Sequence, residues 1–226
     1  MQGEHEGALK PPSGQVRRQG IVALSHPHIP YTNQETEKMS RLTRKTYEEL
    51  TEDQREVFDN IVASRPVKPK DGHIGGPFDI WLRSPELGRR LVGLGGFFRF
   101  NTTVDRRYIE LVILVTGQHW QAQFEWWAHE PMAREAGVPE DVIQAIKNGD
   151  QPQLSDAGDQ AAYAMINELI QTKELSEQSY AAAVAQFGEV GVAELIALSG
   201  FYTMVSMTLN GFDVDLPAGA EAPFKK

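Results

Sequence analysis

Two residues four positions apart, Glu125 and His129, offer the clearest chemistry in this sequence. On a helix they would lie one turn apart on the same face, where side chains interact. A carboxylate beside an imidazole raises the affinity of the ring for a proton and orients the ring. The pair can therefore act as a general acid–base unit. An ordinary helix-surface hydrogen bond has the same spacing, so the pair alone leaves both interpretations open.

Glu110 is a third candidate, because it interrupts the apolar run 108–115. A run that is apolar on every side predicts a buried helix. A carboxylate inside such a helix must be paired, protonated or turned toward a cavity. A structural salt bridge to Arg106 or Arg107 is the alternative to a catalytic role. We predict as catalytic residues Glu110, Glu125 and His129.

Aromatic and cationic side chains near these residues can bind a substrate. Indole rings can wall a pocket and exclude water, and a guanidinium can hold a substrate carboxylate with two parallel hydrogen bonds. For His119 a structural role is equally open, since a cation at the end of a helix suits the helix dipole. The predicted substrate-binding residues are His119, Trp120, Trp126, Arg99 and Arg106.

The three catalytic candidates would also suit a metal, as a set of two carboxylates and one histidine, if their helices faced each other. The sequence has no Cys, and neither the His-x-x-x-His nor the Glu-x-x-His spacing of helical metal sites. It also lacks a Gly-x-Ser-x-Gly elbow, a phosphate loop and a dinucleotide fingerprint. We expect no metal and no organic cofactor, with a metalloenzyme as a minor alternative.

Composition excludes several classes of protein. The 226 residues contain 22 Lys and Arg against 31 Asp and Glu, a formal net charge of −9. An acidic chain repels nucleic acid and anionic membranes, so we expect neither as a partner. The lack of Cys excludes thiol nucleophiles and Cys-ligated clusters. We find no unbroken apolar run long enough to span a bilayer and no export signal, and expect a cytoplasmic protein.

Helix signals follow one another along most of the chain, and we find no convincing strand. Thr51 opens a capping box, Ser84 precedes a Pro at the first helical position, and Asp105 and Ser176 can cap further helices. Glycines in the second helix predict close packing against a neighbour. About eight helices are predicted, over 51–62, 84–98, 105–119, 121–136, 139–147, 155–173, 176–187 and 190–210.

Composition also divides the chain into three parts. Residues 1–45 are rich in Gly, Pro and Gln, which is typical of an extended or partly disordered arm. We expect one all-α domain over 46–217 and a flexible, Pro- and Ala-rich tail over 218–226.

A longer pattern links the candidate residues to the C-terminal helix. It comprises Glu110, Glu125, His129, Pro131, Ala133 and 135–138, with 200–206 and 210–217 near the C-terminus. Together these segments resemble the carboxymuconolactone decarboxylase/alkyl hydroperoxidase D-like family over about residues 47–217. The resemblance implies the all-α fold of that family. It also implies a homo-oligomer, a trimer or hexamer, with the pocket near a subunit interface.

This family carries two chemistries on one fold. Its peroxidases have a Cys-x-x-Cys pair at the positions of Ala122 and Glu125, so the absence of Cys excludes a thiol peroxidase here. Its decarboxylases use no metal, thiol or organic cofactor. The resemblance therefore implies a cofactor-independent lyase that decarboxylates a small lactone or aromatic-derived acid, with His129 tuned by Glu125 and Glu110 orienting or relaying. An isomerase or lactone hydrolase on the same scaffold, and a non-catalytic helical assembly protein, are the alternatives.

Overall fold

The structure is a computed structural model, which describes residues 41–43, 45–65, 69 and 73–225. Regular structure in this part consists of a short 3-10 helix and eight α-helices, which confirms the predicted all-α class. The elements are η1 (Tyr47–Glu49), α1 (Glu52–Ser64), α2 (Phe78–Trp81), α3 (Pro85–Phe100), α4 (Arg106–His119), α5 (Gln123–Glu135), α6 (Glu140–Asn148), α7 (Ala157–Thr172) and α8 (Glu177–Gly211).

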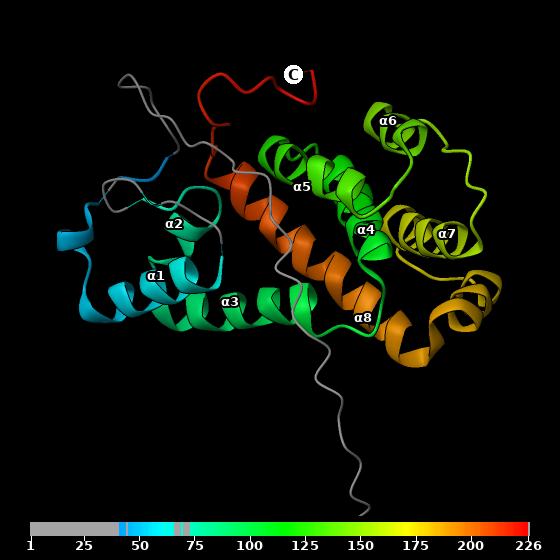
Figure 1. The fold of residues 1–226 in the computed structure, drawn as a ribbon, viewed down its shortest axis with the longest axis horizontal. Helices are drawn as coiled ribbons and strands as arrows, with labels where there is room; N and C mark the ends of the chain where they lie inside the picture. The colour runs from blue at the N-terminus through cyan, green and yellow to red at the C-terminus, as the bar shows by residue number, and fades with distance from the viewer. Residues whose placement is uncertain (1–40, 44, 66–68, 70–72, 226) are drawn as a thin grey trace, which may run out of the picture.

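Two groups of helices lie on either side of α8, which runs diagonally across the molecule in Figure 1. In the first group, α3 packs against α1 and α2 beside a small apolar cluster that includes Val57, Phe58 and Ile61. In the second group, α4 contacts α5, α6, α7 and α8. The larger core belongs to both groups, since Trp81 and Phe98 of the first group pack into it.

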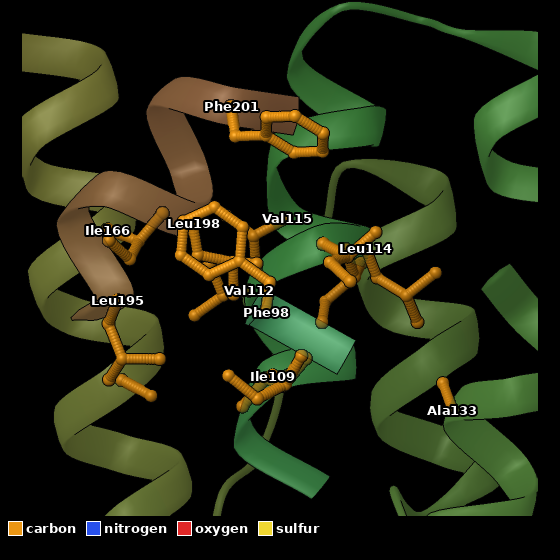
Figure 2. Close-up of a cluster of buried hydrophobic side chains, with 14 of the residues drawn as sticks. Phe98, Ile109, Val112, Leu114, Val115, Ala133, Ile166, Leu195, Leu198 and Phe201 are labelled. Carbon is orange, nitrogen blue, oxygen red and sulfur yellow. The ribbon is translucent and has the colours of Figure 1, made fainter. Parts of the chain in front are cut away.

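Helix α4 is enclosed on all sides, which explains why its sequence is apolar all round. Every residue from 109 to 117 is buried. Figure 2 shows Val112 of α4 in one cluster with Leu198 of α8 and Ile166 of α7. Each fully buried aliphatic side chain of this kind stabilises the fold by ~1.5–3 kcal/mol. The helix is therefore a rigid support for Glu110, the carboxylate that it carries.

Most of the predicted helix caps are present. Thr51, Asp105 and Ser176 each accept a hydrogen bond from a backbone N–H two or three residues further on. Ser84 takes the N-cap position before Pro85, as predicted, although its side chain makes no such bond. The last two predicted helices form one element, α8, which is interrupted at Gly188 (φ 66°).

The predicted loop between the first two helices contains a short helix, α2. The Asp79 carboxylate folds back and accepts hydrogen bonds from the backbone N–H groups of Ile74 (2.8 Å) and Gly75 (3.2 Å). These bonds close the turn that precedes α2. The sequence pattern gave no sign of the helix because α2 is a single turn long.

Two glycines of α3 make the close contacts that the sequence predicts. A Cβ atom at Gly88 would lie 2.8 Å from the carbonyl oxygen of Trp81, and one at Gly95 would lie 3.3 Å from the ring of Phe201. The prediction is wrong for Gly93 and Gly96, where a Cβ atom would meet nothing within 4 Å.

The predicted flexible tail is wrong at Phe224, which is 6% exposed. The side-chain amide of Gln123 donates to the carbonyl oxygen of Phe224 (2.8 Å) and accepts from its N–H (3.0 Å). The Phe224 ring lies edge-on to Trp126, with 5.3 Å between ring centroids. Composition suggested a loose end, but these contacts fix the tail against α5.

Most of the predicted N-terminal arm, 1–45, lies outside the described residues. The described part lies near the end of α8, where the N–H of Arg41 donates to the carbonyl oxygen of Phe212 (2.8 Å). The Arg83 guanidinium also donates to the carbonyl oxygen of Thr43.

Helix α8 is long and apolar enough to cross a membrane by length and composition alone. The core helix of a soluble protein passes the same test, and α8 packs here against α3, α4, α5 and α7. No unbroken apolar run marks α8 in the sequence, because small polar residues lie among its apolar ones.

Candidate active site

A tight turn brings together α4 and α5, the two helices that carry the predicted catalytic residues. The chain leaves α4 through Trp120 and enters α5 after Gln121, whose φ of 48° reverses its direction. The N–H of Ala122 donates to the carbonyl oxygen of Gly117 (3.0 Å) and closes the turn. A Cβ atom at Gly117 would lie 3.7 Å from Cγ of Glu125, so the Glu125 side chain of α5 lies against α4 at this glycine.

His129 lies between two buried carboxylates, as the sequence predicted only in part. Its Nδ1 is 2.7 Å from Glu110 Oε2, and its Nε2 is 3.1 Å from Glu125 Oε1. Glu110 is 0% exposed, Glu125 4% and His129 9%. The structure thus brings all three predicted catalytic residues together.

The two carboxylates decide the protonation of the ring. Burial by itself would lower the pKa of His129, but the charges of Glu110 and Glu125 and their hydrogen bonds outweigh it and raise the pKa to about 9. Both ring nitrogens can donate to a carboxylate only when the imidazole is protonated. His129 is therefore an imidazolium cation at neutral pH.

Arg106 contacts the other oxygen of Glu110 from one turn earlier on α4. The two groups form an ion pair, yet Glu110 Oε1 accepts no aligned hydrogen bond from a described residue. Glu110 thus lies between two cations and keeps a buried oxygen with spare hydrogen-bonding capacity. The predicted salt bridge to Arg106 and the predicted site role are both compatible with this geometry.

Tyr202 of α8 also reaches the site, which sequence reasoning missed. Its ring lies edge-on to the His129 imidazole, with 5.1 Å between centroids. Burial, followed by the charges of Glu125 and Glu110, raises the pKa of Tyr202 far above its usual range, so its hydroxyl stays protonated. The segment 200–206 contributed to the family resemblance, but only packing reveals that this one residue faces His129.

The predicted substrate-binding residues divide into two sets. Arg106 contacts Glu110, and Arg99 is close enough to Arg106, Tyr202 and Glu110 for their charges to shift its pKa. Burial is the first cause of that shift and Arg106 the second, and both lower the pKa of Arg99. Arg106 therefore belongs to the His129 cluster by direct contact, whereas Arg99 stacks over Phe100, 5.3 Å from the ring centroid.

The other three predicted residues point elsewhere. Trp126 is fully buried, its indole N–H donates to Glu130 (2.8 Å), and its ring faces the C-terminal tail. Trp120 donates to the hydroxyl of Thr203 (3.2 Å). His119 is exposed and lines a separate cavity of about 220 Å³ together with residues of α6 and α7. The structure does not show these three side chains in contact with His129.

No group of three or more His, Asp or Glu side chains within the described ranges has a geometry suited to a metal ion. Both ring nitrogens of His129 already face carboxylate oxygens, so neither presents a free lone pair to a cation.

Comparisons with known proteins find similarity in the fold. No protein-family model matches the chain, and a search of curated proteins finds no match. A protein of unknown function from Agrobacterium tumefaciens, a candidate antioxidant defence protein AhpD, is 15% identical with a TM-score of 0.56. That match covers 63% of this chain and 99% of the other.

Two larger matches extend the similarity. The apo form of the debrominase Bmp8 is 11% identical with a TM-score of 0.60, over 81% of this chain and 94% of its own. An uncharacterized peroxidase-related protein from Silicibacter sp. TM1040 is 10% identical with a TM-score of 0.61, over 82% and 95%. The chain has the same AhpD-like fold as these proteins, which confirms the predicted architecture. A shared fold does not by itself define an activity.

Proposed function

Starting from the AhpD-like helical fold, we propose that this chain is a cofactor-independent acid–base enzyme that decarboxylates a small lactone or aromatic-derived acid. One observation carries the proposal: a buried histidine with a carboxylate on each ring nitrogen. Such an imidazolium is a poised proton donor, and its surroundings are dry enough to strengthen every electrostatic interaction. A debrominase with the same fold supports the view that this scaffold can hold an active site.

His129 is the general acid in this proposal. When the carbon–CO₂ bond of the substrate breaks, its electron pair passes to the carbon and the adjoining carbonyl or enol system. The N–H bond at Nε2 of His129 then breaks, and the proton moves to that carbon. Solvent returns one proton to the neutral imidazole, so each turnover consumes one proton and releases one CO₂.

The neighbours of His129 hold and release this proton. Glu110 accepts from Nδ1 and fixes the orientation of the ring. Glu125 lies on the same face of α5, 3.1 Å from Nε2, and must turn aside to expose that N–H to a substrate. Tyr202 stays neutral and can donate a hydrogen bond to a developing oxyanion.

We also propose that the chain acts in the cytoplasm as a homo-oligomer, a trimer or hexamer. Support comes from large apolar side chains that the single chain leaves exposed on α3 and α8. They are Leu87 (49% exposed), Leu94 (43%), Phe97 (36%), Phe100 (64%) and Met207 (54%). Leu87 and Leu94 are seven positions apart and so share one face of α3, and an exposed apolar face is typical of protein interfaces. Light scattering at micromolar concentration tests the assembly, and a monomeric mass would contradict it.

The activity itself is tested by product analysis. Purified protein is incubated with a panel of carboxylated lactones and unsaturated acids, and products are identified by mass spectrometry together with CO₂ release. We expect CO₂ and a product one carboxyl group smaller, lost in the variant His129→Gln but retained in Glu140→Gln, which alters an exposed carboxylate. If the product is an isomer or a hydrolysed lactone and no CO₂ is released, the enzyme is an isomerase or a lactone hydrolase and not a decarboxylase. Full turnover by His129→Gln would overturn the acid–base site.

A further inference from the structure

A cavity separate from the His129 cluster lies near the end of α4, between that helix, α6 and α7. Its volume is about 220 Å³. Sites for drug-sized ligands enclose roughly 300–1,000 Å³, so this cavity suits a smaller molecule built on a single ring. Its lining includes three side-chain amides, those of Gln118 in α4, Asn167 in α7 and Gln171 in α7, and we call it the amide-lined cavity.

Part of the lining is apolar. Val115 of α4 and Ile146 of α6 are buried, and Ile170 of α7 is half-buried. The Tyr163 ring adds an aromatic surface, and its hydroxyl donates to Gln151 (3.5 Å). The face of an aromatic ring carries partial negative charge, which attracts the C–H hydrogens of a saturated ring. The cavity can therefore pack against the apolar face of such a ring. 

The three amides of the cavity are available to a ligand. Gln118 and Asn167 are half-buried and Gln171 is exposed, and none of these side chains hydrogen-bonds to a described residue. A Cβ atom at Gly149, the glycine that ends α6, would lie 3.2 Å from Nε2 of Gln118. The absence of a side chain at Gly149 therefore leaves room for the Gln118 amide. Each amide presents both N–H donors and a carbonyl acceptor.

The hydrogen-bonding groups of the lining favour an uncharged ligand. An anion would use only the N–H groups of the amides, and the Asp150 carboxylate at the exposed rim would repel it. A cation would use only the carbonyl oxygens and leave the amide N–H groups unpaired. Burial, and then the charge of Lys173, lower the pKa of His119, so its imidazole is also a neutral donor and acceptor. A hydroxyl group, which both donates and accepts, matches these side chains.

We propose that the amide-lined cavity is a second binding site, which takes a small uncharged molecule rich in hydroxyl groups. A monosaccharide and a cyclic polyol share this chemistry. Each has C–H groups on the face of its ring, which pack on Tyr163, and hydroxyl groups at its edge, which bind Gln118 and Asn167. The site shares no residue with the His129 cluster, so it does not depend on the proposed function.

Nuclear magnetic resonance tests the site directly, because side-chain amides give signals of their own. The isotope-labelled full chain is titrated with glucose and with myo-inositol. We expect at least one probe to shift the amide signals of Gln118, Asn167 and Gln171 in a saturable way, and the probe that binds more tightly identifies the source of the hydroxyl groups. Glucuronate and glucosamine each keep the sugar ring but add a charge. Both should bind several-fold more weakly than the tighter uncharged probe.

Substitutions that keep the shape of a side chain but remove its amide test the assigned contacts. Gln118→Met and Asn167→Leu should each weaken binding about five- to tenfold, because a hydroxyl group of the ligand loses a hydrogen bond. Gln178→Met, on the exposed surface of α8, is the matched control and should bind with native affinity. Circular dichroism confirms folding, and Gln171→Met, at the exposed rim, replaces either variant that unfolds.

The outcomes keep this site apart from the proposed function. His129→Gln should bind the probe with native affinity, because His129 does not line the cavity. Native affinity in Gln118→Met or Asn167→Leu would overturn the proposal, and so would a charged analogue that binds as tightly as the uncharged probe. If neither glucose nor myo-inositol shifts the amide signals, the cavity holds only water, and the second site fails while the acid–base site is untouched.

Discussion

Adjacent arginines at the start of α4 each pair with a buried carboxylate. The two pairs differ in whether the arginine contacts both oxygens of that carboxylate. Arg107 binds Asp159 of α7 through Nε (3.0 Å) and a second guanidinium nitrogen, so both carboxylate oxygens are used by one cation. Arg106 contacts Glu110, whose second oxygen binds His129. Asp159 is 1% exposed and Glu110 0%.

The two pairs are equally buried, but their partners differ, and this difference is the reason for proposing chemistry at Glu110 and not at Asp159. The network around Asp159 is closed, because its N–H also donates to Asp156 (2.9 Å), the cap of α7. The Glu110 pair instead includes an imidazole that can lose its proton and a carboxylate oxygen without an aligned hydrogen bond. A titratable partner within reach, rather than burial, separates the pair that we propose to be catalytic from the one that we expect to be structural.

Replacing the imidazole gives the largest expected effect. His129→Gln keeps a donor for one carboxylate but removes the proton that we assign to catalysis. We expect kcat/KM to fall about 10³-fold, within the roughly 10²–10⁴-fold that acid–base groups contribute. Steady-state kinetics on the substrate identified by product analysis checks this, with circular dichroism to confirm folding. An unchanged kcat/KM would show that the two arginine pairs are both structural.

Breaking the closed pair should act on stability instead. Asp159→Asn leaves the Arg107 guanidinium without its counter-charge, and we expect the free energy of unfolding to fall by ~4 kcal/mol, as for other broken buried pairs. Turnover at moderate temperature should stay near the native rate. Urea denaturation measures the loss, and Glu56→Gln, which alters an exposed partner of Arg89, should show no comparable change. Loss of turnover in folded Asp159→Asn would erase the difference between the pairs.

The two faces of α5 should also differ in what a substitution affects. On the Trp126 face it should affect stability, and on the His129 face it should affect activity. Phe224→Ala removes the ring that packs on Trp126, away from His129. We expect unfolding to become easier by ~3 kcal/mol, the lower end for a buried Phe, because a terminal segment can partly collapse into the space. Thermal unfolding checks the change against Lys225→Ala, an exposed neighbour. A loss of kcat/KM without a loss of stability would contradict this division of α5.

Local spacing predicted the parts of the site that lie on one helix, and long-range packing supplied the rest. Glu125 and His129 are neighbours on α5 because of helical geometry, and Glu110 was conspicuous as an acid in an apolar run. Tyr202 was missed, because only the packing of α8 places it beside His129. It has no sequence pattern that distinguishes it from an ordinary core tyrosine.

The differences between the expectations and the structure have equally physical causes. Trp126 is next to Glu125 in sequence, but one residue turns a helix by ~100°, so its side chain leaves the face that carries the acid–base pair. The tail was expected to be flexible from its Pro and Ala content, whereas Gln123 and Trp126 fix Phe224. Composition indicates how flexible a segment is in isolation, but it does not include the tertiary contacts that the segment makes in the folded chain.

The smallest expected effect is a shift in the pH dependence of stability and of the rate. Such a shift should involve the Arg106–Glu110 pair, which contacts His129, and not the Arg107–Asp159 pair. The pKa of His129 is about 9 in the folded chain against an unperturbed 6.5. A raised pKa means that the stabilisation from this group is complete below about pH 6.5 and is lost as the pH rises through about 9. The rate should fall over the same upper range, as the acid loses its proton.

Glu125→Gln removes one of the two negative charges that raise the pKa of His129. The upper limb of the kcat/KM profile should therefore move down by ~1 pH unit, the lower end of the shift that a nearby opposite charge produces. Asp159→Asn should leave the limb in place, because Asp159 contacts Arg107 and not His129. NMR titration of the His129 ring protons gives the pKa directly. Glu125→Gln could instead leave the upper limb of the kcat/KM profile and the pKa of the His129 ring unchanged. The general acid would then have to be a group other than His129, and the Arg106–Glu110 pair would lose its proposed role in catalysis.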